Sequence, residues 1–296
     1  MTRLPEEHVH VDNFSAPRMF HALFQWAVNL REVGDLPSAC SAAEALCREA
    51  QSADELRQAY RLLAGLRRAS GDLPGARPAL EFLVDLARRT ASVDPVLNNQ
   101  LDLLAALDEL GDLARQQGDD WTVLECHGNH GRAAILRELE RHYPGQANLL
   151  TELCYSLRRA GNAARALGSH EEARNLLEER LTVARVNCAA NPGDDRLVSM
   201  VAAALADLGG LLAALRVPRA ESLLREELGL RTWLESVRPG DAKARQDLAT
   251  CHVAMTTVGV DTAEHKAMAT HLLAQIEQEG GLDLSGHHLL STLRAG

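Results

Sequence analysis

Apolar positions along the chain are filled mostly by Leu, Ala and Val, and they lack the alternating β-branched pattern that marks β-strands. This mixture favours helices that pack closely through small residues. Four prolines interrupt it at nearly constant spacing, since Pro95, Pro144, Pro192 and Pro239 are 49, 48 and 47 residues apart. Because proline cannot continue a helix, each one marks where a helix stops before another begins. The chain is therefore predicted to be an all-α array of repeated helical units.

A second periodic signal lies between the prolines. It begins with a turn glycine, found at Gly34, Gly71, Gly118 and Gly168. Five residues later a small apolar residue starts the second helix of a pair, at Ala39, Ala76, Val123 and Ala173. Seven residues before the glycine, the first helix also carries a small residue, at Ala27, Ala64, Gly111 and Gly161. Small side chains let two helices approach closely, so these positions predict helix hairpins that touch there.

This pattern resembles the tetratricopeptide repeat, most visibly in LAALDELGDLARQQGD (104–119) and LRRAGNAARALGSHEEA (157–173). The resemblance covers about residues 16–279 and implies a right-handed α-solenoid, or superhelix, of about six helix hairpins. The turn glycines are 37, 47 and 50 residues apart, which resembles the long-repeat bacterial variant of the family. We expect a flexible N-terminal segment at 1–15 and a C-terminal capping helix within 280–296.

The last two units depart from the pattern. Arg216-Val217-Pro218 replaces the glycine turn of the fifth unit, and Ala220 comes one residue early. In the sixth unit His252 occupies the small-residue position. We therefore expect the two helices of the sixth hairpin to splay apart.

Charge narrows the classes of partner. The 296 residues carry a formal net charge of −10, which disfavours binding to nucleic acid. Every basic residue except Lys243 and Lys266 is arginine, whose planar group pairs with carboxylates bidentately.

The first residues lack the basic and apolar run of a secretion signal, and the six cysteines form no disulfide framework. We expect a cytoplasmic protein.

One stretch, 198–215, is apolar enough and long enough to raise the possibility of a membrane span. Asp207 and the Gly209-Gly210 pair interrupt its middle, and it falls in phase with the repeat. It is predicted to be a buried helix of the array, so no membrane is expected.

The twelve histidines raise the alternatives of a metal site or an enzyme. His127 and His130 have a spacing that suits one helix face, but no third ligand is evident, and Gly128 and Gly131 weaken the helix between them. We predict a kink there, with both histidines packed or hydrogen-bonded and no metal or other cofactor.

One further group of residues, and a search for catalytic motifs, bear on the alternatives of a metal site or an enzyme. His8, His10 and Asp12 alternate in a segment where flexible polar sequence is the simpler expectation. No H-E-x-x-H, G-x-S-x-G or phosphate-loop motif occurs, so no enzyme is predicted.

In the resembled family, the first helix of each hairpin lines a concave groove. Counting back three, six, ten and thirteen residues from each turn glycine gives the corresponding positions here. The predicted partner-binding residues are Phe24, Arg31, Arg61, Arg68, Arg115, Tyr155, Arg158, Asn162 and Arg165. The Arg158-x-x-x-Asn162 spacing resembles one that some family members use to hold a peptide's carboxylates, while Asp108 and Asp112 interrupt the basic patch.

The sequence therefore predicts a non-enzymatic adaptor that holds an acidic segment of a partner protein in an arginine-lined groove. One alternative is that the arginines form only a solvated face, paired with neighbouring acids. A second is an enzyme or metal protein that uses histidines on the helical scaffold. A third is a self-associating module, a homo-oligomer, whose interface is the apolar fifth unit or the irregular sixth hairpin.

Overall fold

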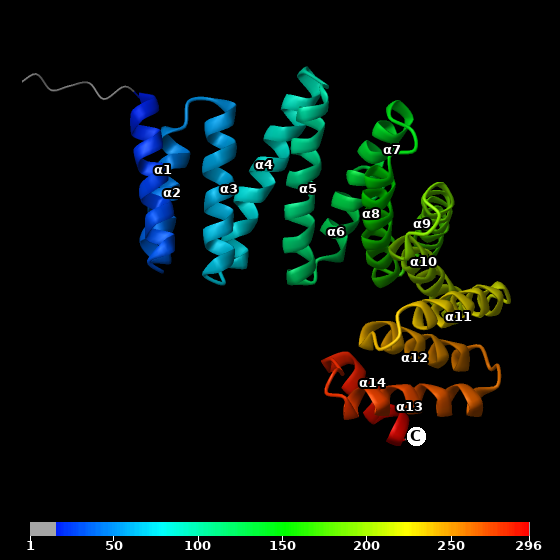
Figure 1. The fold of residues 1–296 in the computed structure, drawn as a ribbon. Helices are drawn as coiled ribbons and strands as arrows, with labels where there is room; N and C mark the ends of the chain where they lie inside the picture. The colour runs from blue at the N-terminus through cyan, green and yellow to red at the C-terminus, as the bar shows by residue number, and fades with distance from the viewer. Residues whose placement is uncertain (1–15, 296) are drawn as a thin grey trace, which may run out of the picture. The chain divides into compact units, whose positions relative to one another are not determined.

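The computed structural model describes residues 16–295, and every regular element in that range is a helix (Figure 1). The fourteen helices fall into two compact units that divide between Gln117 and Gly118, called unit 1 and unit 2 below. The predicted all-α repeat fold is confirmed for the described residues. The handedness of the superhelix stays a prediction, as do the domain limits. The segment 1–15, with His8, His10 and Asp12, lies outside the described residues.

Within the described residues, unit 1 contains five helices that pack consecutively, each on the next (Figure 1). They are α1 (Ala16–Glu32), α2 (Leu36–Glu49), α3 (Ala53–Ala69), α4 (Leu73–Val93) and α5 (Leu97–Gln117). A core formed by Phe20, Ala27, Ala42, Leu46 and Ala59 joins α1, α2 and α3. The buried side chains are mostly Ala and Leu, which is the composition that close helix packing requires.

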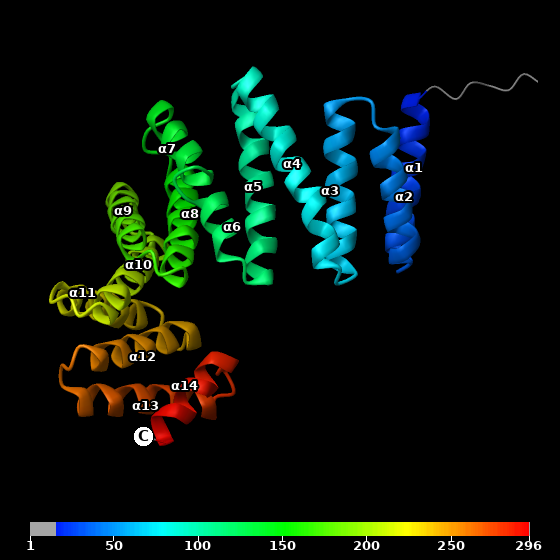
Figure 2. The same ribbon diagram turned by 180° about the vertical axis from the view of Figure 1, so that it is seen from behind.

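Unit 2 contains nine helices within the described residues. They are α6 (Asp120–His127), α7 (Arg132–His142), α8 (Ala147–Ala166), α9 (His170–Ala190), α10 (Asp195–Ala214), α11 (Arg219–Val237), α12 (Ala242–Thr257), α13 (Thr262–Gln278) and α14 (Leu284–Ala295). Helices α8 to α13 pack as three antiparallel pairs, and each pair also packs on the next (Figure 2).

The hairpin register matches the sequence pattern. Gly34, Gly71, Gly118 and Gly168 adopt φ values of +84°, +79°, +71° and +76°, the left-handed conformation that glycine adopts without strain. Ala27 and Ala64 are buried at the small-residue position. At Gly161 there is no room for a side chain, because an added Cβ would lie 2.8 Å from Leu177 Cδ2 of α9. The small residues therefore set the approach of the paired helices, as predicted.

Aspartates after the turn glycines begin the second helices. The carboxylates of Asp35, Asp72 and Asp119 accept hydrogen bonds from backbone N–H groups of the first helical turn. Proline follows in the first turn of α2 and α4, where no intrahelical donor is lost. Ser169 makes no such side-chain bond at the start of α9, so this cap is absent there.

The second helix of the third unit is broken into two pieces, which raises the helix count from the thirteen expected to fourteen. Helix α6 ends at His127 and α7 begins at Arg132. The backbone folds tightly between them, because a Cβ on Gly131 would lie 2.2 Å from the Cys126 carbonyl oxygen. Only glycine fits this close approach, and the predicted kink is a complete interruption.

The sixth hairpin does not splay, so that expectation is wrong. Ala249 of α12 and Ala269 of α13 are both fully buried in one core cluster. His252 contacts His265 near the turn, and Arg245 binds Glu279 at the far end. Helix α14 adds Leu290 to the same cluster and lies against α13 as the predicted capping helix (Figure 2).

The apolar stretch forms α10, the one helix among the described residues that is long and apolar enough to cross a membrane. Half of its apolar segment is buried inside unit 2. It packs against α9 on one side and α11 on the other. The apolar composition of α10 is therefore explained by its place in the array, packed between α9 and α11.

Candidate functional site

Groove 1 lies in unit 1, where α1, α3 and α5 line a hollow of about 670 Å³. Phe24 and Arg31 enter it from α1, and Gln58 and Arg61 from α3. Leu62, Gly65, Leu66 and Ala69 contribute its apolar part. Four residues at the counted groove positions of the first two units therefore line one cavity, and they combine an aromatic ring, an amide and two guanidinium groups.

The arginines of groove 1 differ in their partners. Arg57, which sequence counting missed, donates to Asp102 of α5 at 2.6 Å and lies 3.4 Å from Asp54. Arg61 Nε lies 3.1 Å from Glu109 Oε1. Within the described residues Arg31 has no acidic group at ion-pair distance, and its side chain is exposed. Groove 1 thus combines two arginines paired with acids and one, Arg31, that has no acidic partner in the described part of the chain.

Two further predicted residues of unit 1 lie outside this lining. Arg68 is half-buried near the end of α3 and has no acidic partner among the described residues. Arg115 is exposed on α5, where its Nε is 3.9 Å from Asp112 of the same helix. Arg115 therefore faces an acid one turn away, as the solvated-face alternative expects.

Groove 2 lies in unit 2 between α8 and α10, with a volume of about 540 Å³. Tyr155 and Arg158 line it from α8, and Met200 and Ala203 from α10. Arg180 of α9 also contributes to the lining, although only 3% of its surface is exposed. The predicted residues Tyr155 and Arg158 thus share a cavity with a buried arginine that groove counting did not find.

Asp207 joins the two arginines of groove 2. Its carboxylate accepts a hydrogen bond from Arg180 and lies 3.3 Å from Arg158 Nε. Arg180 also donates to the Ala203 carbonyl oxygen at 3.2 Å. Burial lowers the pKa of Arg180, and the nearby Asp207 carboxylate opposes that shift. Two guanidinium groups share one carboxylate here, so Arg158 is not a free guanidinium.

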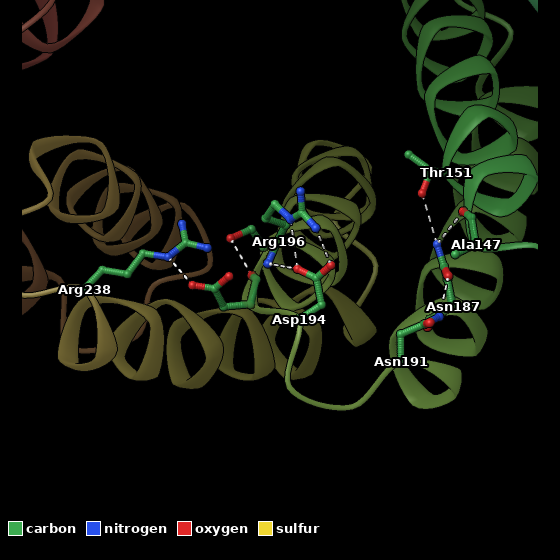
Figure 3. A network of polar contacts seen from close by, with 9 residues as sticks. Ala147, Thr151, Asn187, Asn191, Asp194, Arg196 and Arg238 are labelled. Carbon is green, nitrogen blue, oxygen red and sulfur yellow. Dashed lines mark hydrogen bonds and ion pairs between the residues drawn. The ribbon is translucent and has the colours of Figure 1, made fainter.

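A polar network fixes the mouth of groove 2 (Figure 3). The buried Asn187 side chain donates to the Ala147 carbonyl oxygen at 3.2 Å and to Thr151 Oγ1 at 3.1 Å, which ties α9 to the start of α8. Asn191 donates to Asn187 Oδ1 at 3.2 Å. At the start of α10, Asp194 accepts from Arg196 Nε at 3.1 Å. These contacts hold the ends of three helices in place around the opening.

The remaining predicted residues of α8 are not brought into groove 2. Asn162 is half-buried, its Oδ1 has no hydrogen-bond partner, and it does not line the cavity. Arg165 is exposed and has no acidic partner among the described residues. The Arg158-x-x-x-Asn162 pair therefore does not assemble around this cavity, because Arg158 lines it and pairs with Asp207 whereas Asn162 lies outside the lining.

One feature of the sequence indicates a polar contact in groove 2 that counting from the turn glycines does not find. Asp207 is the single charged residue inside an otherwise apolar helical stretch, and such a residue requires a partner when it is only 19% exposed. Arg180 and Asn187 lie on the second helix of a hairpin, which the groove count does not sample.

His127 and His130, each expected to be packed or hydrogen-bonded, behave differently. His127 is 1% exposed, and its Nε2 lies 3.3 Å from Arg159 Nη1. Burial, with Arg159 and Arg132 nearby, lowers the pKa of His127 to about 3. His130 is exposed in the interruption between α6 and α7, so its predicted packing role is wrong. Among residues 16–295, no three His, Cys, Asp or Glu side chains gather in a way that would hold a metal ion.

A second histidine pair was not anticipated. His252 of α12 and His265 of α13 share a hydrogen bond of 2.8 Å between their Nδ1 atoms. Burial and the neighbouring His265 lower the pKa of His252. Burial raises the pKa of the adjacent Cys251 thiol. Burial likewise raises the pKa of Cys154, to about 12.

No protein-family model matches the sequence, and no curated protein is significantly similar to it. Solved structures are similar in fold. The apo form of RapI has a TM-score of 0.52 at 11% identity, covering 95% of this chain and 76% of RapI. TTC0263, a thermophilic TPR protein of Thermus thermophilus, has a TM-score of 0.40 at 17% identity, covering 81% of this chain and 100% of TTC0263. The TPR2AB domain of yeast Sti1, in its pHSP90 complex, has a TM-score of 0.31 at 14% identity, covering 94% and 97%.

These similarities extend to the fold alone. The repeat type follows from the chain itself, through buried small residues in the first helix, positive-φ glycines at the turns, and paired helices that stack consecutively in each unit. Together these features describe a helical-repeat fold that resembles the tetratricopeptide fold.

Proposed function

We propose that this chain is a non-enzymatic, cytoplasmic interaction scaffold that holds an acidic segment of a partner protein on the groove faces of its first helices. The observation that carries the proposal is Arg31, an exposed guanidinium beside Phe24 in groove 1 that has no acidic partner among residues 16–295. A guanidinium that already has an acidic partner must exchange it on binding, whereas a free one only loses water.

Pairing divides the predicted recognition residues into two sets. Arg61, Arg115 and Arg158 each lie near an acid of the same unit. Arg31, Arg68 and Arg165 have none among the described residues. The second set is therefore assigned the ionic contacts to the partner, and Arg158 is assigned to the internal structure of groove 2.

Groove 1 also offers an apolar surface to the partner. Phe24 and Leu62 are partly buried, and the position of Gly65 has open space around it, with no atom within 4 Å of an added Cβ. A side chain of the partner can fill that space while its acidic neighbours reach Arg31. The fitting segment therefore alternates acidic residues with larger apolar ones.

The test uses a fluorescent peptide of about ten residues in which Glu alternates with Leu, and a Lys–Leu peptide of the same length. Fluorescence anisotropy on the full chain should show binding of the acidic peptide only, weakening as salt rises. Arg31→Glu with Arg68→Glu should weaken it at least ~10-fold, since each contact contributes roughly 1.5 kcal/mol. Arg88→Glu with Arg89→Glu is the matched control on exposed positions of α4.

Two outcomes contradict the proposal. One is a parent protein that binds the Lys–Leu peptide as well as the acidic one. The other is an equal loss of affinity in both double variants, which would mean that net charge alone attracts the peptide.

A further inference from the structure

Groove 2 carries one positive charge more than its own side chains neutralise. At its inner end the guanidinium groups of Arg158 and Arg180 face one carboxylate, that of Asp207. At its mouth Arg196 is matched by Asp194, with Arg196 Nη2 2.9 Å from Asp194 Oδ2 (Figure 3). Two guanidinium groups against one carboxylate leave one positive charge at the inner end without a counter-ion among the described residues.

Arg180 also has hydrogen-bonding capacity that the described residues leave unused. Its Nη1 donates to the Ala203 carbonyl oxygen and to Asp207, whereas its buried Nε has no hydrogen-bond partner among them. The residue is 97% buried, being 3% exposed, and it lines groove 2. A buried donor without a partner costs free energy, and a guanidinium binds a carboxylate through two parallel N–H groups. This buried arginine therefore indicates a site for an oxyanion.

Two other buried arginines of unit 2 provide the contrast. Arg231 and Arg245 also have an Nε without a hydrogen-bond partner among the described residues. Arg231, however, lies near two carboxylates, and Arg245 binds both oxygens of Glu279. Neither of them lines groove 2. Of these three buried arginines, only Arg180 shares its one carboxylate with another arginine and also lines the groove.

The rest of the lining indicates what kind of molecule carries the oxyanion. Tyr155 of α8 and Met200 of α10 line the groove from two different helices, and Ala147 and Leu197 add apolar surface. Tyrosine rings stack on flat aromatic groups, and the methionine thioether also contacts such rings favourably. The volume of about 540 Å³ is in the range of small-molecule sites and larger than an inorganic anion requires. Groove 2 therefore suits an anionic head attached to a flat apolar body.

We propose that groove 2 binds a small aromatic monocarboxylic acid, with its carboxylate at Arg180 and Arg158 and its ring against Tyr155 and Met200. The one surplus charge at the inner end matches a carboxylate, whereas a phosphate monoester carries about two negative charges at neutral pH. A peptide that ends in an aromatic residue presents the same two groups, so it is the other source to distinguish. The site is separate from groove 1 and does not depend on the acidic partner segment proposed there.

Saturation-transfer NMR titration of the full chain tests the site, with 3-phenylpropionate as the probe. The neutral 3-phenylpropionamide should bind at least ~10-fold more weakly, because hydrogen bonds to a charged group are the stronger ones. Arg158→Gln should weaken 3-phenylpropionate binding at least ~10-fold, since Arg180 and Asp207 then neutralise each other. Arg165→Gln is the matched control and should bind as the parent does, because it makes the same change at an exposed position of α8 outside the lining.

Met200→Glu places a carboxylate in groove 2 and should abolish binding by a second route if circular dichroism shows that Arg158→Gln is misfolded. Arg31→Glu with Arg68→Glu should leave 3-phenylpropionate binding unchanged, so the outcomes for the two grooves are distinguishable.

Five results overturn the proposal. They are a parent that does not bind 3-phenylpropionate, an amide that binds as tightly as the acid, an equal loss in Arg165→Gln, tighter binding of phenyl phosphate, and tighter binding of the peptide Ala-Ala-Ala-Phe with a free terminal carboxylate. The last of these would identify a peptide terminus as the occupant of groove 2.

Discussion

Gly161 of α8 lies directly against Leu177 of α9, so that a methyl group at position 161 would stand 2.8 Å from Leu177 Cδ2. Gly209 of α10 has the same relation to Leu224 of α11. Gly161→Leu and Gly209→Leu should each lower the free energy of unfolding by about 1 to 3 kcal/mol through overpacking. Urea denaturation measures the change.

Gly210 supplies the control for that prediction, because an added Cβ there meets no atom within 4 Å. Gly210→Leu should not lower stability, and the better helix propensity of leucine should raise it by up to about 0.8 kcal/mol. Equal losses at the adjacent positions 209 and 210 would mean that helix contact at the small residue is not what limits the hairpin.

Arg216 stands where the fifth unit lacks its turn glycine, and it adopts φ +56°. A left-handed backbone costs a residue with a side chain roughly 1 to 2 kcal/mol. Arg216→Gly should therefore raise the melting temperature, with a gain of about 1 kcal/mol in stability. Arg216→Ala keeps the Cβ and should give no gain. A larger gain for alanine than for glycine would show that loss of the charge, and not of the strain, is responsible.

Asp207 neutralises the buried guanidinium of Arg180 and also faces Arg158. Asp207→Asn should destabilise unit 2 by on the order of 3 to 5 kcal/mol, because breaking a buried pair leaves a charge without its partner. Glu221→Gln is the control, since the Glu221–Arg225 pair is exposed and should contribute under about 1 kcal/mol. Similar small losses in both variants would contradict the assignment of Asp207 as the structural anion of groove 2.

Glu227 is buried on α11, and burial raises its pKa to about 7 despite the nearby Arg231. The folded protein therefore holds this proton more tightly than the unfolded chain, whose carboxyl titrates near its ordinary 4.5. Stability should fall as pH rises through that window and level off above about 7. Urea denaturation at pH 5 and pH 8 should show a loss for the parent that Glu227→Gln reduces by on the order of 2 kcal/mol.

The neighbouring exposed Glu226 provides the comparison for this titration. Glu226→Gln should follow the parent between the two pH values. If Glu227→Gln also follows the parent, the buried carboxyl does not titrate in this range.

His252 has its pKa lowered by burial and by His265, with Glu264 acting in the opposite direction. A lowered pKa means that the folded state favours the neutral ring, so stability should be lost as pH falls below about 6.5, the ordinary value. From pH 7.5 to pH 5, the melting temperature of His252→Ala should rise relative to that of the parent. The difference between His271→Ala, on an exposed position of α13, and the parent should stay constant over the same range.

The backbone of the array was predictable because its determinants are local. Turn glycines, capping aspartates and small residues act within a few positions of one another, so Ala27, Ala64, Gly161 and their turns could be placed by counting alone. The break after His127 was indicated by two glycines, but its geometry depends on carbonyl contacts within the folded turn, and this exposed His130 where packing was expected.

The candidate site was less predictable because its charges pair between helices. Arg61 binds Glu109 and Arg158 binds Asp207, partners that lie 48 and 49 positions away in the sequence. Helix periodicity shows which side chains of one helix share a face. It does not show which acidic residue of a neighbouring helix lies opposite a given arginine. The count of free arginines therefore required the tertiary structure.

Helix α14 fixes how the number of repeats in this chain can change. Its inner side is occupied by α13 and its outer side is polar, so a further hairpin added directly after α14 would find no apolar stacking surface. At this end, a duplication can lengthen the array only if it inserts a hairpin upstream of α14, where both neighbours offer apolar faces. The capping helix thus closes the C-terminal end of the array to direct addition of repeats.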